Sequence, residues 1–156
     1  MAVKAKQAAG SFQEVQGKTS RYGRALRGIQ DELVQKEYER AVAGNAQAQF
    51  ELGERFYQGL GVEIDYANAA AWFELAAKQG HPGAQRILAM IYFLGRGVAP
   101  DPAEAYKWVH LACVRGEEKA LSIQKKIAAK ISAEARAEGE KRAANMAISP
   151  SPRPIP

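Results

Sequence analysis

The chain has 156 residues, of which 47% are hydrophobic and 25% charged, a balance typical of a soluble globular protein with one modest core. No apolar run approaches the roughly 20 residues needed to cross a bilayer, and the first 30 residues lack the apolar stretch of a secretory signal. The formal net charge of +5 arises from residues 1–28, which hold six basic side chains and one acidic side chain. Residues 29–156 hold 16 of each sign.

Residues 1–28 form the first predicted segment. They are rich in Gly, Ser, Gln and Ala and carry few large apolar side chains, so they bury too little surface to offset the entropy of ordering. The composition predicts a flexible basic tail. Two alternatives stay open: an electrostatic contact with an anionic lipid, RNA or acidic protein surface, and an organellar targeting peptide, which would make the location mitochondrial.

Residues 29–43 follow as a predicted leading helix that ends before Gly44. The next two segments, residues 44–79 and 80–115, align without a gap and are identical at 13 of 36 positions. We call these segments repeat 1 and repeat 2. A fixed period of this size indicates a stacked array of structural repeats.

Each repeat is predicted to hold two helices. In repeat 2, Ala84, Leu88 and Tyr92 share one helical face, and a glycine pair then ends the first helix. Asp101, followed by Pro102, caps the second helix. The matching features of repeat 1 include the glycines at 59 and 61 and the cap at Asp65. The second helices carry one tryptophan each, Trp72 and Trp108, which are predicted to be buried between neighbouring helix pairs.

These motifs resemble SEL-one-like repeats, relatives of the tetratricopeptide repeat. The resemblance covers residues 44–116 and rests on the G-x-x-x-A-Q opening, the G-x-G-V turn, the capping aspartate and the A-x-x-W-x-x-x-A second helix. It implies an all-α fold, a right-handed α-solenoid of antiparallel helix pairs with about seven helices. It also implies an adaptor or assembly scaffold without chemistry of its own.

Residues 116–147 are predicted to form a partial third repeat with a cap. Residues 117–131 have the apolar spacing of a first helix, but the glycine turn is missing. Ser132 instead can cap a last, polar helix over about 133–147, in which Gly139 costs ~1 kcal/mol relative to alanine. The solenoid would thus cover 29–147. The tail 148–156 holds four of the seven prolines and is predicted to be extended.

The binding face is predicted from the resemblance, which places the first helices on the concave surface. Side chains turned away from the buried stripe are the candidates, because an apolar residue with a polar rim suits a short peptide or a partner helix. The candidate protein-binding residues are Gln47, Phe50, Glu54, Arg86, Met90, Lys119 and Lys126. Phe50 could instead pack on the helix of residues 29–43, and Met90 could fill an irregular gap.

The sequence offers no catalytic, cofactor or metal site. The single cysteine, Cys113, rules out a cysteine-based zinc cluster and favours the reducing cytoplasm, and we expect it to be a small buried residue. The predicted function is a non-catalytic protein-protein interaction module whose partner is another protein and not a specific nucleic acid. A structural subunit of a larger, possibly membrane-associated or organellar complex is the alternative, and a hydrolase is disfavoured.

Overall fold

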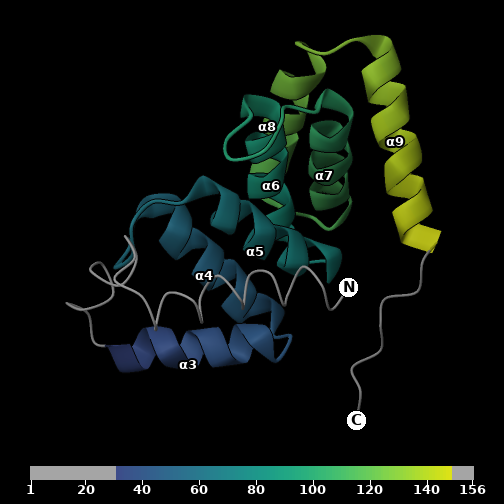
Figure 1. Cartoon of the computed structure of the whole chain (residues 1–156). Coiled ribbons are helices and arrows are strands. Elements are labelled where there is room, and N and C mark those ends of the chain that lie inside the picture. Colours follow the sequence, from purple (N-terminus) through teal and green to yellow (C-terminus); the bar gives the residue numbers. More distant parts are fainter. Residues whose placement is uncertain (1–30, 149–156) are drawn as a thin grey trace. The chain divides into compact units, whose positions relative to one another are not determined.

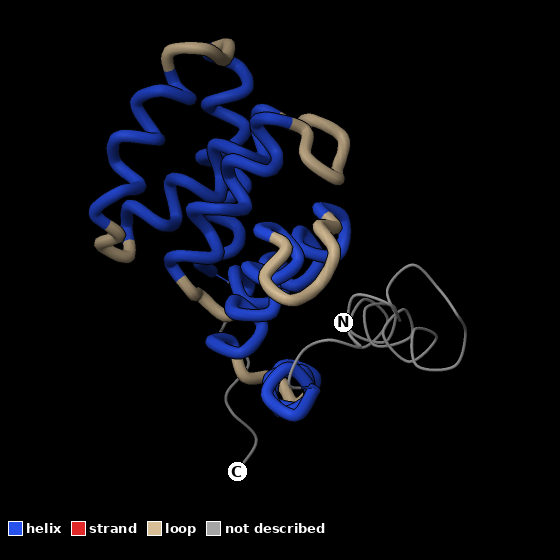
Figure 2. The backbone as a smooth tube through the Cα atoms, turned by 90° about the vertical axis from the view of Figure 1, so that its left-hand side faces the viewer, coloured by secondary structure: helices blue, strands red, loops and turns tan. Residues whose placement is uncertain are grey.

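The computed structural model of the protein describes residues 31–148, which form seven helices and no strand (Figures 1 and 2). The helices are α3 (Asp31–Val42), α4 (Ala46–Gln58), α5 (Tyr66–Lys78), α6 (Pro82–Leu94), α7 (Pro102–Val114), α8 (Glu118–Ala128) and α9 (Ala133–Ile148). The all-α prediction is confirmed for this part of the chain. The predicted basic tail, residues 1–28, lies outside the described residues, and so does the proline-rich tail from residue 149 on.

The chain divides into two compact units after Ala76. The first unit contains α3, α4 and most of α5, and the second contains α6 to α9. No helix within residues 31–148 is long and apolar enough to cross a membrane.

Aromatic rings form the core of the first unit. Trp72 is only 2% exposed and meets the ring of Tyr38 edge-on, with 6.2 Å between the ring centroids. Phe73 lies against Phe50 and Tyr57 of α4, at 5.8 Å and 6.2 Å. Gly53 makes this packing possible, because a Cβ atom there would lie 2.8 Å from two carbons of the Phe73 ring. A glycine in the middle of α4 therefore brings α4 and α5 close together.

The first helix of each repeat ends as predicted. Gly59 and Gly95 adopt the left-handed conformation, with φ angles of 71° and 68°, and their amides donate to the carbonyls of Arg55 and Ile91. The loop then returns to the helix it left, because the amide of Asp101 donates to the carbonyl of Tyr92. Asp65 makes the equivalent bond to Phe56.

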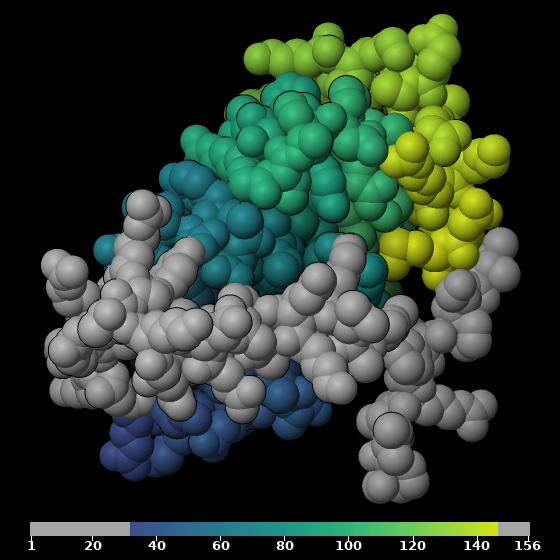
Figure 3. Space-filling model, viewed as in Figure 1, coloured from purple at the N-terminus to yellow at the C-terminus, as the bar shows by residue number. Residues whose placement is uncertain are grey.

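Helix α7 is the centre of the second unit. It packs on α6, on α8 and, along its length, on α9. Figure 3 shows the yellow α9 against the green body of this unit. Trp108 is 1% exposed, so the prediction that both tryptophans are buried is confirmed.

Gly139 lies where α9 crosses α7. A Cβ atom at this position would be 2.7 Å from the carbonyl oxygen of Ala103 and 3.0 Å from Cβ of Tyr106. From the sequence alone, Gly139 was expected only to lower the stability of the helix. In the structure its missing side chain lets the two helix backbones come together.

The third repeat departs from the expected pattern after α8. Only residues 129–132 connect α8 to α9, whereas residues 59–65 and 95–101 connect the helices of the two complete repeats. Ser132 does cap α9, since its Oγ accepts from the amide of Ala135 at 3.1 Å. However, α9 packs along α7 and not along α8 (Figure 1). Within residues 31–148, the first helix of the third repeat therefore lacks a second helix of its own.

Candidate protein-binding surface

Side-chain caps fix where the first helices start. Asn45 accepts from the amide of Ala48 at 2.8 Å, and His81, at the equivalent position of repeat 2, accepts through Nδ1 from Ala84 at 3.1 Å. Glu117 precedes α8 and makes no capping bond. Asp101 caps α7 as predicted, with 3.0 Å between its carboxylate and the amide of Glu104.

A buried glutamine fastens each complete repeat to the helix before it. The amide of Gln49 donates to the carbonyl of Ala41 at 3.0 Å, and that of Gln85 donates to Ala77 at 3.1 Å. Both glutamines are buried. The third repeat has Leu121 at this position, which cannot donate such a bond.

Three candidate residues lie on α4. Gln47 and Glu54 are seven residues apart and so share one stripe of the helix, where Gln47 is exposed and donates to Glu51 at 2.9 Å. Phe50 is half-buried and its ring contacts Phe73 of the same unit. This contact gives Phe50 a packing role within repeat 1.

Arg86 stands at the repeat position of Phe50 and behaves differently. Its Nε donates to Glu117 at 3.0 Å, which joins the start of α6 to the residue before α8. Both side chains are about three-quarters buried or more, so this ion pair is screened less than a surface pair. Arg86 therefore holds the two first helices of the second unit together.

The remaining candidates occupy the repeat positions that correspond to Gln47 and Glu54 of α4. Met90 on α6 is half-buried, whereas Lys119 and Lys126 on α8 are exposed. The structure thus brings Arg86, Met90 and the α8 lysines into one unit.

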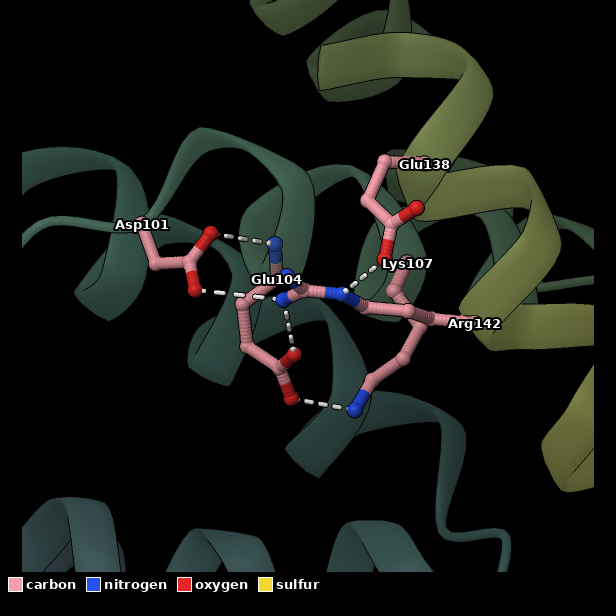
Figure 4. A network of polar contacts seen from close by, with 5 residues as sticks. All are labelled: Asp101, Glu104, Lys107, Glu138 and Arg142. Atoms are coloured by element: carbon pink, nitrogen blue, oxygen red, sulfur yellow. Dashed lines mark hydrogen bonds and ion pairs between the residues drawn. The ribbon is translucent and has the colours of Figure 1, made fainter. Parts of the chain in front are cut away.

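A network of charged side chains joins α9 to the start of α7, and sequence reasoning missed it. Arg142 donates to Asp101 at 3.2 Å, to Glu104 at 3.0 Å and to Glu138 at 3.0 Å (Figure 4). Lys107 also pairs with Glu104, and its ammonium lies 4.2 Å from the centre of the Trp108 ring. Because the partners are 38 and 41 residues apart, no local spacing rule could have found them.

These contacts shift the ionisation of the groups involved. Burial alone would raise the pKa of Asp101, but the amide of Glu104 and the guanidinium of Arg142 outweigh it and hold that pKa below its usual value. The hydrogen bond to Glu138 and then that to Asp101 raise the pKa of Arg142. Asp101 and Arg142 therefore both stay charged over the whole physiological range.

Cys113 and His110 occupy the second half of α7. Cys113 is half-buried, which corrects the expectation of a buried residue, and burial together with the nearby charge of Glu117 raises the pKa of its thiol. His110 stacks on Tyr106 and lies 3.1 Å from the amide of Gln124 on α8. Among the described side chains, no group of three or more His, Cys, Asp or Glu is placed to hold a metal ion.

Several large apolar side chains outside the set of candidate binding residues are exposed. They are Leu33, Val42, Leu60, Ile64, Leu94, Val114 and Leu121. Leu33 and Leu121 belong to the two outermost elements of the repeat pattern, α3 and α8. The signal that could have found Leu121 is its occurrence at a position where both complete repeats have glutamine.

The fold and the recurring caps define a class, a helical repeat protein built from pairs of antiparallel helices. The family model described as the Sel1 repeat matches residues 46–81 and 82–116 of the chain. Proteins with Sel1 repeats generally mediate protein-protein interaction and are typically non-catalytic.

Solved structures support the same fold. A protective antigen present in uropathogenic Escherichia coli strains, which displays an SLR fold, superposes with a TM-score of 0.70 and 27% identity over 93% of this chain and 29% of its own. A Sel1 repeat protein from Oxalobacter formigenes superposes with a TM-score of 0.58 and 23% identity over 91% of this chain and 57% of its own. The chain thus spans less than two thirds of either protein. A search of curated proteins gives no match.

Proposed function

We propose that the protein is a non-catalytic adaptor or assembly scaffold that binds a peptide or a partner helix through the exposed sides of its first helices. The observation that carries this proposal is the surface of the second unit. There Met90 and the exposed Leu94 lie on α6, four and eight residues after Arg86, which pairs with Glu117, and the exposed Lys119 and Lys126 lie on α8. Apolar contact area with a charged rim is suited to a short helical or extended ligand.

The proposal includes a division of labour along the chain. The solenoid of residues 29–147 would bind, while the segments 1–28 and 148–156 would act as tails, and the protein would work in the cytoplasm. The alternative, a permanent structural subunit, is favoured only by the basic character of residues 1–28.

The test uses the full chain with a photo-crosslinking residue at Met90 or, as a control, at the exposed Lys141 of α9. Illumination in native extract is expected to give the same protein partner repeatedly from position 90 and not from position 141. Arg86→Glu should abolish that product while Lys141→Glu keeps it. Equal labelling from both positions would contradict a binding face on α6 and α8.

A further inference from the structure

The two outermost elements of the repeat pattern are complementary halves of one repeat. Helix α3 aligns with the second helices α5 and α7, because the loop residues Asn45 and His81 that follow α3 and α5 are equivalent. Helix α8 aligns with the first helices α4 and α6. Within residues 31–148, α3 therefore has no first helix of its own, and α8 has no second helix packed along it.

The open face of α3 is the face that complete repeats bury. In repeat 1, the side chains of Ala69, Phe73 and Ala76 are fully buried, and Phe73 contacts the first helix of its own repeat. Their counterparts in repeat 2 are also fully buried. The counterparts in α3 are Leu33, Glu37 and Arg40, and of these Leu33 is 58% exposed and Arg40 is exposed.

The open face of α8 is the face with which a first helix contacts the second helix of its own repeat. The Gln49 and Gly53 positions of α4 are buried, and Gly53 lies against Phe73 of the second helix. The third repeat has Leu121 and Lys125 at these positions. Leu121 is 52% exposed and Lys125 is exposed, because no second helix covers them.

Helix α9 leaves this face open because it docks elsewhere. It covers Ala103 and Lys107 of α7, which are buried. Their counterparts in α5, Ala67 and Ala71, are exposed and half-buried. The docking position of α9 is therefore one that repeat 1 does not use.

The two helices that bear the open faces carry opposite formal charge, although the α3 face itself holds one residue of each sign, Glu37 and Arg40. Helix α3 contains four acidic and two basic residues, a formal charge of −2, and α8 contains one acidic and three basic residues, a formal charge of +2. The repeat register places Glu37, at the Phe73 position, opposite Lys125, at the Gly53 position. Both carboxylate oxygens of Glu37 already accept from Arg55, but each has a second lone pair for a further donor.

We propose that the protein self-associates head to tail, with α3 of one copy completing the third repeat of the next by packing on its α8. Leu33 would cover Leu121, and Lys125 would pair with Glu37 of the other copy. Such a contact joins two different surfaces, so it adds copies one after another until a ring closes or the chain of copies ends. This inference concerns a surface separate from the proposed binding face and does not depend on it.

The experiment uses the full chain and two variants, Leu121→Lys, which closes the α8 face, and Leu33→Lys, which closes the α3 face. Sedimentation equilibrium should show the mass of the unmodified chain rising above the 17.0 kDa monomer with protein concentration. Each variant alone should stay monomeric. An equimolar mixture should form a dimer and stop there, since only one pair of intact faces remains.

Val114→Lys, at an exposed valine at the end of α7, is the matched control and should associate like the unmodified chain. Circular dichroism must show unchanged helix content in all three variants, as expected for exposed positions. The proposal is overturned if the unmodified chain stays monomeric up to its solubility limit, if either face variant still associates, or if the mixture gives no dimer. Added salt should weaken the association, because its ion pair is intermolecular.

Discussion

Trp108 and Gly139 occupy the same place relative to their helix caps, seven residues after Asp101 and seven after Ser132. At this place α7 carries the largest side chain and α9 carries none. Trp108 is buried in the core of the second unit, whereas Gly139 puts the backbone of α9 directly against that of α7. The comparison shows two ways to pack a helix against its neighbours. In a complete repeat the large ring of Trp108 fills the space around α7, whereas α9 packs through close contact between backbones at Gly139.

Removing the buried ring of Trp108 should have the largest effect on stability. Trp108→Ala deletes a buried ring and is expected to lower the free energy of unfolding by about 3–5 kcal/mol. Urea denaturation followed by circular dichroism measures it, with Leu94→Ala as an exposed control. A loss below about 1 kcal/mol would mean that this ring does not hold the helices together.

The contact between a small residue on one helix and a large residue on the next can also be tested inside the repeats. Gly53 and Phe73 of repeat 1 correspond to Ala89 and Val109 of repeat 2, so the pair changes together. Phe73→Val should cost about 2–3 kcal/mol by leaving a cavity, and Gly53→Ala about 1–2 kcal/mol by overpacking. The double variant should lose about 1 kcal/mol less than the sum, in a double-mutant cycle by urea denaturation. Strict additivity would contradict the coupling.

Close backbone contact predicts a cost for the smallest possible side chain. Gly139→Ala should destabilise the protein by about 1–2 kcal/mol, although alanine favours a helix by ~1 kcal/mol, because the clashing atoms belong to the α7 backbone. Thermal and urea denaturation measure the change. Ala137→Gly, at an exposed position of α9, reports the helix propensity alone. A stabilised Gly139→Ala variant would show that α9 does not rest on α7 here.

The charged part of the α7–α9 contact should contribute least and should depend on pH. The pKa of Asp101 is lower in the folded than in the unfolded protein, so its stabilising effect is present above the unfolded pKa of about 3.9 and is lost as the pH falls through the folded value. Asp101→Asn keeps the capping oxygen but not the charge. Its destabilisation, under about 1 kcal/mol at pH 7 for this half-exposed group, should shrink as the pH falls below the unfolded pKa and vanish once Asp101 is protonated in the folded protein. Urea denaturation midpoints of the two proteins, measured from pH 7 into the acidic range, provide the test. A difference in stability that does not change with pH would exclude a charge effect.

The parts of the fold that repeat locally were predictable. Glycine turns, the caps Asp65, Asp101 and Ser132, and the burial of both tryptophans follow from spacing within a few residues, and the structure confirms them. The position of α9 was not predictable in this way, since it depends on a short connection and on one close contact far along the chain. The only signals were the four-residue connection 129–132 and a glycine in a helix otherwise rich in alanine.

The candidate surface was predictable in composition but not in contacts. Phe50 and Arg86 are equivalent in the repeat, yet one packs on a ring and the other pairs with Glu117. Such differences arise because the partner residue changes as well, and a single sequence does not show which residue that is. Leu121 was read as part of an apolar helix face, but its exposure follows from where α9 docks.

The hydrogen bonds of the buried glutamines also affect which helix unfolds locally first. Gln49 and Gln85 each tie the start of a first helix to the last turn of the helix before it, and α8 has no such tie because it carries Leu121. On its far side α9 remains held by Arg142 and by the contact at Gly139. Helix α8 keeps the Arg86–Glu117 pair at its start but lacks the glutamine bond. We therefore expect its amides to exchange with solvent before those of α9, although α9 is nearer the end of the chain.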